Sequence, residues 1–417
     1  MNIMAKRDAV IIGYDMVSPL GTELGEQWNR AERGESGIGR LTRFDYNDDF
    51  PVKVAGQVGA FDSSPYPFLK PREMAHWTSP IYPYALLVVH RALRRAGLEI
   101  TPDLAPRVGI TFSTAVGGLD AVLGADRLMI EKGRLPHPFT NPNSCINMVG
   151  GKVSILTGAT GPITSVITAC ATGCTSMTVG MMMMKQGLAD VVICGAVDFC
   201  LVEPIVAGFA TMNGAYKTRG AEEPSPEKTS MPFSLNRKGF VISEGAGAII
   251  IATEEFARAH GLDYSIAIAG WGMTSDAEHF VAPRYETVRR CSCNALEAAG
   301  LKPEDIDSIN AHATSTKVGD RVEADVIRDI FSDVPPVTAN KSLTGHAMGA
   351  SSAIESILAM EGMLRNTVPP TINYEPDPEI NLAEVAVEPE SVEQEFVLKN
   401  SFGFGGCNTC IVFQRVK

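Results

Sequence analysis

The chain has 417 residues, of which 45% are hydrophobic and 20% are charged. This balance is typical of a globular protein and excludes an intrinsically disordered chain, a collagen and a small disulfide scaffold. The net charge of −12 argues against a nucleic-acid-binding protein, because such proteins carry an excess of basic residues.

The first residues, MNIMAKRDAVIIGYDM, predict the lead-in to a first strand rather than a signal peptide, since no long apolar segment follows the basic pair. No apolar run approaches the about 18 residues that a membrane helix needs. The nine cysteines are odd in number, and several lie in apolar surroundings, which is typical of a reducing compartment. We therefore expect a cytoplasmic protein without a membrane span.

Short β-branched runs predict two successive series of strands. The first series covers residues 8–12, 108–112, 165–168, 191–193 and 248–251, and the second covers 265–269, 307–310, 337–340, 396–399 and 410–414. Helical spacing predicts helices over 84–96, 286–299, 322–330 and 351–364. This alternation predicts an α/β fold with a mostly parallel sheet covered on both faces. The two series suggest two similar halves, residues 1–253 and 254–417.

The first candidate for chemistry is Cys170, in the segment TACATG between a predicted strand and a predicted helix. Small neighbours would allow a sharp turn that places the thiol at the helix N-terminus. There, free amide groups and the helix dipole favour a thiolate and could stabilise an oxyanion. The alternative is a small buried core cysteine, which is what we expect of Cys174 one turn further on.

The second and third candidates follow predicted strands nearer the C-terminus. His312 ends a short strand and is followed by hydroxyl side chains, at the position where α/β proteins place sites. Lys341 leaves another strand, His346 precedes a helix that begins with small residues, and Glu355 lies on that helix. The alternatives are a hydrogen-bonded structural histidine, a surface lysine and a helix-capping histidine.

The fourth candidate is NSFGFGGCNTC, in which glycines surround Phe402 and Phe404. A mobile backbone with bulky apolar side chains suits a gate over an apolar pocket. The spacing of Cys407 and Cys410 resembles a zinc motif. However, a zinc site needs compact knuckle loops, whereas Cys410 begins an apolar strand, so we expect no metal.

Four motifs occur together and in order: TACATG, HATSTKVGD, KSLTGH and NSFGFGG. With them the sequence resembles the β-ketoacyl-acyl carrier protein synthases of the elongating type, which belong to the thiolase superfamily. The resemblance extends over nearly the whole chain. It implies a thiolase-type layered αβαβα fold of two pseudo-repeated halves.

The resemblance also implies residue roles. Cys170 would be the nucleophile that takes the growing acyl chain. His312 and His346 would support the loss of CO2 from a malonyl thioester and stabilise the enolate. Lys341 would set the electrostatic environment, and Glu355 would brace that lysine.

The implied binding residues surround this catalytic set. The amides of Cys170 and Phe404 would form the oxyanion hole, and Phe404 would also gate the pocket. Contacts to the phosphopantetheine arm or the acyl chain would come from Thr314, Thr316, Val116, Phe209 and Phe402. No cofactor is implied beyond the phosphopantetheine that arrives on the carrier protein.

The implied reaction is the decarboxylative Claisen condensation of an acyl chain with malonyl-acyl carrier protein, in fatty acid or polyketide and polyene biosynthesis. A carbon nucleophile made by decarboxylation needs donors for the enolate oxygen and a held electrophile, rather than a strong base. The implied partners are an acyl carrier protein and a second subunit, in a homodimer or a heterodimer with a chain-length partner. We expect the carrier to dock on cations such as Lys70, Arg72, Lys217, Arg219 and Arg284.

Several positions depart from the family pattern, and they suggest a paralogue with an altered carrier or chain preference. They are Ala313, Lys317, Ser234, Ser243, Asn213 and Cys407. Two other functions stay open. A non-catalytic chain-length partner would typically lack a cysteine at position 170. A thiolase would use a second, C-terminal cysteine, for which Cys407 is a candidate.

Overall fold

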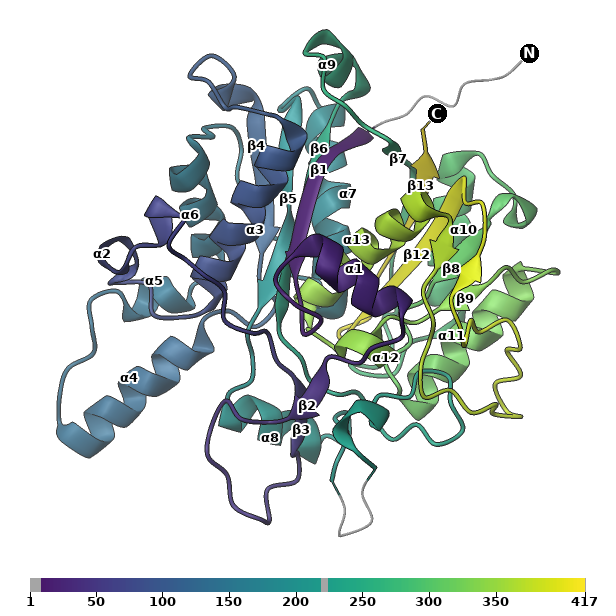
Figure 1. The fold of residues 1–417 in the computed structure, drawn as a ribbon, viewed down its shortest axis with the longest axis horizontal. Coiled ribbons are helices and arrows are strands. Elements are labelled where there is room, and N and C mark those ends of the chain that lie inside the picture. The colour runs from purple at the N-terminus through teal and green to yellow at the C-terminus, as the bar shows by residue number, and fades with distance from the viewer. Residues whose placement is uncertain (1–8, 219–223, 417) are drawn as a thin grey trace.

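The computed structural model describes residues 9–218 and 224–416, and one large sheet organises them (Figure 1). This sheet has nine strands, which lie side by side in an order far from their order along the chain. The order is β4 (Val108–Ser113), β5 (Val191–Asp198), β6 (Gly245–Ala252), β1 (Ala9–Val17), β7 (Ile266–Ser275), β13 (Cys407–Arg415), β12 (Phe396–Gly403), β8 (Ser308–Asn310) and β9 (Val337–Thr338).

The predicted mostly parallel sheet is wrong. Parallel pairs occur only towards the two ends of this sheet, between β4 and β5 and along β12, β8 and β9. The five pairings between them are antiparallel. The predicted strands 396–399 and 410–414 are shorter than β12 and β13. The prediction therefore did not show that a turn of only three residues, 404–406, joins the two strands. A connection this short can only join antiparallel strands.

One predicted strand, at residues 165–168, is not formed. Its N-terminal neighbour Ile163 makes an isolated bridge with Ile110 at the outer edge of β4. Pro162 and Thr164 form backbone hydrogen bonds with Ile110 of β4, but residues 165–168 do not continue this pairing. The β-branched pattern of this segment is therefore left at a sheet edge.

The two ends of the sheet form two β layers. Helices pack on the outer side of each β layer and between them, which gives the layered αβαβα arrangement (Figure 1). One outer layer packs on β4, β5, β6 and β1, the central layer packs between the two ends of the sheet, and the other outer layer packs on β7 and β13. The outer helices are α3 (Ile81–Ala96) with α6 (Asn147–Thr157), and α10 (Tyr285–Ala299) with α11 (Lys317–Ile330); the central helices are α7 (Thr172–Lys185) and α13 (Gly349–Arg365). The α/β prediction and the four predicted helices are confirmed.

The remaining α-helices and two small sheets complete the fold. The helices are α1 (Leu24–Glu32), α2 (Pro71–Met74), α4 (Leu119–Lys132), α5 (Thr140–Ser144), α8 (Glu203–Thr211), α9 (Glu254–Ala259) and α12 (Lys341–Thr344). Two small antiparallel sheets pair β2 (Ile38–Arg40) with β3 (Val54–Gly56), and β10 (Thr367–Val368) with β11 (Glu390–Ser391). None of the helices in residues 9–218 and 224–416 has the length and apolar character needed to cross a bilayer.

The central helices α7 and α13 position the site, and they approach each other closely at Gly173. A Cβ atom added there would lie 2.5 Å from the backbone nitrogen of Ala353 in α13. That distance is far below van der Waals contact, so only glycine lets the two helices pack this way. The packing brings the N-termini of both helices to the same place.

We expect Gly173→Ala to lower the free energy of unfolding by about 1–3 kcal/mol, because the added methyl group forces the two helices apart. The matched control is Gly151, a glycine of α6 where an added Cβ would meet nothing within 4 Å. Gly151→Ala should raise the free energy of unfolding by about 0.8–1 kcal/mol through helix propensity. Guanidinium denaturation measures both, and a Gly173→Ala protein as stable as Gly151→Ala would contradict the proposed constraint.

Candidate active site

Cys170 lies in a single 3-10 turn, Ala169–Ala171, that leads directly into α7. Ala169 adopts φ 47°, a conformation that non-glycine residues rarely take. The hydroxyl of Thr172 locks this turn by donating to the carbonyl of Ala169 at 2.7 Å and accepting from the amide of Thr168 at 3.1 Å. The turn thus holds the buried Cys170 thiol at the N-terminus of the central helix, where the sequence pattern placed it.

The predicted resting thiolate is wrong. Burial raises the pKa of the Cys170 thiol to about 11, although Lys341 and the backbone amide of Phe404 oppose this rise. Loss of hydration therefore outweighs the charge of Lys341 and the Phe404 amide, and the resting group at neutral pH is a thiol. The nucleophile needs a base that accepts its proton during attack.

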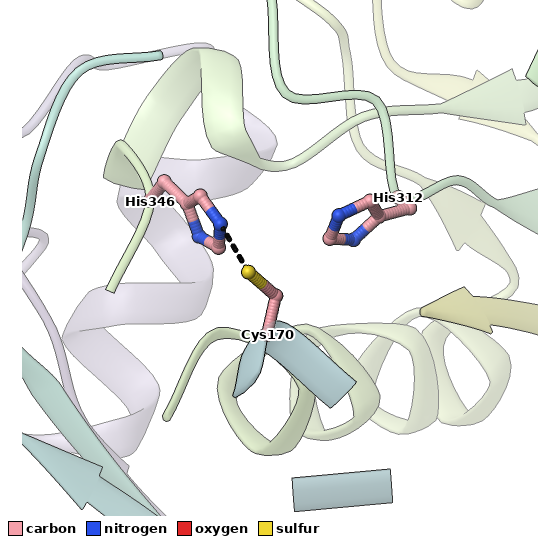
Figure 2. A group of neighbouring side chains, drawn as sticks. All are labelled: Cys170, His312 and His346. Carbon is pink, nitrogen blue, oxygen red and sulfur yellow. Dashed lines mark hydrogen bonds between the residues drawn. The ribbon is translucent and has the colours of Figure 1, made fainter. Parts of the chain in front are cut away.

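His346 lies in position to be that base. Its Nε2 atom is 3.0 Å from the Cys170 sulfur (Figure 2). Its Nδ1 atom is 2.9 Å from the hydroxyl of Ser351 in the first turn of α13. The backbone of His346 is held by hydrogen bonds to Val241 and from Ser243, so both the ring and its attachment are fixed.

His312 faces the same sulfur from the other side (Figure 2). The Cys170 sulfur and one ring nitrogen from each of His312 and His346 all lie within 4.8 Å of one another. The two rings are 5.8 Å apart and nearly perpendicular. One thiol and two imidazoles, far apart in the sequence, therefore meet in one place.

Lys341 fixes the proton of His312. Its Nζ atom donates to the carbonyl of His312 at 2.6 Å and lies 3.3 Å from the Nδ1 atom of that ring. An ammonium group can only donate, so Nδ1 accepts and the ring proton sits on Nε2. Burial, and then the charge of Lys341, hold the pKa of both His312 and His346 well below the usual histidine range. Both rings are therefore neutral at neutral pH.

Buried charges surround this pair of histidines. Glu355 on α13 bonds Lys341 through one oxygen at 2.5 Å and Lys399 on β12 through the other at 2.7 Å. Glu323 on α11 accepts the backbone amides of His312 and Ala313 at 2.8 and 2.7 Å. The sequence interpretation found Lys341 and Glu355 but missed three buried groups, namely Lys399, Glu323 and Ser351. A lone lysine in the apolar strand FVLKNSFG was the one available signal for Lys399.

A cavity of about 610 Å³ has Cys170, His312 and His346 in its wall. Its wall also includes Thr314, Thr316, Phe402 and Phe404 among the predicted binding residues, together with Lys217, Lys238 and Lys317. The amide of Phe404 forms a hydrogen bond with the Cys170 sulfur. Phe404, the residue predicted to gate the pocket, therefore lies next to the nucleophile.

Two predicted residues of the acyl pocket, Val116 and Phe209, are not among the residues that line this cavity. They pack in the neighbouring apolar cluster, against residues such as Phe240 and Met348, and Phe404 packs against that cluster as well. Phe404 thus lies between the open cavity and a closed apolar region.

Residues 6–257 match the family described as "Beta-ketoacyl synthase, N-terminal domain", and residues 266–375 match "Beta-ketoacyl synthase, C-terminal domain". The chain belongs to the β-ketoacyl synthase family. It is 36% identical to 3-oxoacyl-[acyl-carrier-protein] synthase 2 of Coxiella burnetii over 99% of this chain and 100% of the relative. It is 33% identical to the protein of the same name from Vibrio cholerae, with the same coverage.

Two solved structures show the same fold over nearly the whole chain. A β-ketoacyl synthase from Burkholderia phymatum has a TM-score of 0.90 at 28% identity, covering 99% of this chain and 100% of that one. A type II polyketide ketosynthase, in complex with its acyl-carrier protein, has a TM-score of 0.88 at 26% identity, with the same coverage. This β-ketoacyl synthase therefore has the thiolase-type fold of a condensing enzyme, an acyltransferase.

The donor set of the site suits the condensation better than it suits a metal. Within residues 9–218 and 224–416, the group of three or more ligand-type side chains that converge is Cys170, His312 and His346. Because Lys341 keeps a proton on Nε2 of His312, that nitrogen offers a donor rather than a lone pair, and the ammonium would repel a cation. The cysteines of the zinc-like spacing, Cys407 and Cys410, are not part of this group.

The residues that depart from the family pattern lie around the catalytic set rather than within it. Asn213 and Lys317 line the cavity, and Asn213 accepts a hydrogen bond from Lys217 at 2.6 Å. Cys407, the candidate second nucleophile of a thiolase, does not line the cavity. Of the other cations predicted for docking, Lys70 and Arg72 are exposed near α2, Arg284 pairs with Glu278 and Glu286, and Arg219 lies outside the described residues.

Proposed function

We propose that this enzyme condenses an acyl chain held on Cys170 with malonyl-acyl carrier protein to give β-ketoacyl-acyl carrier protein and CO2. The observation that carries the proposal is the meeting of one thiol and two neutral imidazoles in a cavity wall, with Lys341 behind them. Relatives named 3-oxoacyl-[acyl-carrier-protein] synthase support it.

In the first step, the Cys170 sulfur attacks the carbonyl carbon of an acyl thioester while its proton passes to Nε2 of His346. The amides of Cys170 and Phe404 stabilise the oxyanion. The bond from carbon to the carrier sulfur then breaks, and the leaving thiolate takes the proton back from His346. The products are acyl-Cys170 and a free carrier thiol.

In the second step, the malonyl thioester loses CO2, and the electron pair of the broken carbon–carbon bond moves onto the thioester as an enolate. His312 donates to the enolate oxygen through its Nε2 proton, and His346 donates as well. The hydroxyl of Ser351 can donate or accept at Nδ1 of His346, so this ring can serve as base in one step and donor in the other. The enolate carbon attacks acyl-Cys170, and the Cys170 thiolate leaves and takes up a proton from solvent.

The other predicted roles extend this proposal. The hydroxyl oxygens of Thr314 and Thr316 lie 3.0 Å apart in the cavity wall. These two residues would contact the phosphopantetheine arm. Because this arm arrives on the carrier, the proposed reaction needs no resident cofactor. Val116 and Phe209 would contact the acyl chain when Phe404 moves aside. Gly405 and Gly406 follow Phe404 with φ of 83° and 74°, which only glycine adopts easily.

We also propose a cytoplasmic location, which the nine free cysteines favour. In addition, we propose that the chain consists of two halves, residues 1–253 and 254–417. The border of the two family matches, between residues 257 and 266, lies close to this division.

The decisive experiment uses the purified chain alone with a panel of acyl-carrier primers and malonyl-carrier. Mass spectrometry should find each accepted acyl group on Cys170 and then the β-ketoacyl product, and the accepted primers would define chain length and pathway. A product formed only after a second, different chain is added would support the chain-length partner instead. Condensation of acetyl-CoA without malonyl-carrier would support a thiolase.

The carrier dock is expected at the cation-rich cavity mouth. Lys217, Lys238 and Lys317 line the cavity, and the phosphate of the phosphopantetheine arm is an anion. We expect Lys238→Glu and Lys317→Glu to raise the KM for malonyl-carrier, and high salt to reduce this difference. The matched control is Lys302→Glu, a surface lysine that is not part of the cavity. An unchanged KM in both cavity variants would place the dock elsewhere, for example at Lys70 and Arg72.

A homodimer is expected because apolar side chains gather on exposed segments. Helix α4 buries none of its residues, Ile130 on it is 76% exposed, and Ile163 and Ile167 lie exposed beside the outer edge of β4. Exposed apolar side chains gathered beside a sheet edge favour contact with a second copy. Light scattering should give twice 44.6 kDa, and Ile130→Asp with Ile167→Asp should give the monomer. A monomeric wild-type chain would contradict this proposal.

A further inference from the structure

Lys399 is a buried cation next to the catalytic set. It lies on β12 with no exposed surface, between the buried Leu398 and the buried Asn400. Its Nζ atom donates to Glu355 at 2.7 Å and to the backbone carbonyl of Asn400 at 2.5 Å. Burying an ammonium group costs several kcal/mol unless it is paired, so this lysine requires an explanation.

The contacts of Lys399 close a ring of buried polar groups. Lys399 bonds Glu355, which bonds Lys341, which donates to the carbonyl of His312. From there the amide of His312 donates to Glu323, and the side chain of Asn400 donates to the same carboxylate at 3.1 Å. The carbonyl of Asn400 accepts from Lys399 and completes the ring. Lys399 is therefore connected to His312 along both directions of the ring, through Glu355 and Lys341 on one side and through Asn400 and Glu323 on the other.

We infer that Lys399 is a positioning residue for the condensation: it occupies one oxygen of Glu355 so that the other holds Lys341 against His312. This inference rests on the proposed function. Without Lys399, Glu355 has a free oxygen and can take Lys341 with both, which draws the ammonium away from Nδ1 of His312. The proton on Nε2, which donates to the enolate, is then no longer fixed.

Charge balance gives the same residue a second effect. The ring holds two lysines and two glutamates, so it is neutral when all four are ionised. Removing Lys399 leaves one negative charge in excess and makes the imidazolium form of His312 less unfavourable. A protonated Nδ1 cannot accept from Lys341, so the productive contact is lost. The charged and titratable groups around His312 are Lys341 on α12, Lys399 on β12, Glu323 on α11, and His346 and Cys170 at the cavity. Glu355 on α13 is linked to His312 through Lys341.

The test compares Lys399→Met with the matched surface variant Lys302→Met in the full-length enzyme. We expect Lys399→Met to slow malonyl-carrier decarboxylation and condensation by about tenfold to a hundredfold. Acyl loading on Cys170, which uses His346, should change little. The acid limb of the pH–rate profile should move to higher pH, because the pKa of both His312 and His346 rises when this buried cation is removed. The rates of loading and decarboxylation are therefore compared at a pH above this limb.

Three outcomes would overturn the inference. The first is a folded Lys399→Met enzyme with wild-type decarboxylation and an unmoved acid limb. The second is an equal loss of acyl loading and decarboxylation. If Lys399→Met does not fold, the same measurements use Lys399→Gln, which keeps a hydrogen-bond donor without the charge. The third outcome is failure of both variants to fold, which would make the role of the lysine purely structural. Wild-type enzyme that does not condense at all would instead contradict the proposed function.

Discussion

Replacing Cys170 with alanine is expected to abolish acyl loading and to lower condensation by about four orders of magnitude or more, as losses of a covalent nucleophile do. The reason is positional. The Cys170 sulfur lies 3.0 Å from Nε2 of His346 and bonds the amide of Phe404. Rapid-quench assays with a labelled acyl-carrier, and intact-protein mass spectrometry, measure the two steps.

The same variant should keep part of the reaction. His312, His346 and Lys341 remain, so Cys170→Ala should still release CO2 from malonyl-carrier. The matched control is Cys174→Ala, which removes a buried thiol of α7 that touches Ser352, Ser356 and Ser401 instead of the histidines. That control should keep condensation, and undiminished condensation by Cys170→Ala would reject the assignment of the nucleophile.

The structure brings Cys170, His312 and His346 together as the sequence pattern suggested, whereas the predicted strand directions were wrong. Four of the predicted site residues lie next to a turn or a strand end, where the neighbouring residues in the chain suggest a role: Cys170, His312, Lys341 and His346. Glu355 lies inside α13. Strand direction is different, because it depends on which strands pair. Most pairings in this sheet join strands that are far apart in the chain, and a local β-branched pattern does not contain that information. The hairpin of β12 and β13 is local, and it was missed because both strands were predicted too short.

Buried electrostatics were beyond the sequence for a related reason. Lys399 and Glu323 have ordinary neighbours in the chain, and their partners Glu355 and His312 come from other layers of the fold. The prediction that Cys170 is ionised was wrong for the same reason. A helix N-terminus is visible in a sequence, but complete burial of the thiol, which raises its pKa to about 11, appears only after folding.

The two histidines are expected to separate the two steps of the reaction. His346 contacts the sulfur, whereas the Nδ1 atom of His312 is occupied by Lys341 and only its Nε2 proton faces the cavity. His346→Asn should therefore slow acyl loading by about a hundredfold to ten-thousandfold, the usual contribution of a positioned general base. It should slow condensation as well.

His312→Asn should leave acyl loading close to the wild-type rate and slow decarboxylation by about a hundredfold to a thousandfold, the usual effect of losing one preorganised oxyanion donor. Both pKa values are lowered, so wild-type activity should persist to pH values below the usual histidine range and fall only as the rings become protonated. Single-turnover loading and CO2 release, each measured across pH for both variants, test the assignment. If His312→Asn lost loading as severely as His346→Asn did, the rings would act as one unit, and the contact between Lys341 and Nδ1 would not decide which imidazole serves which step.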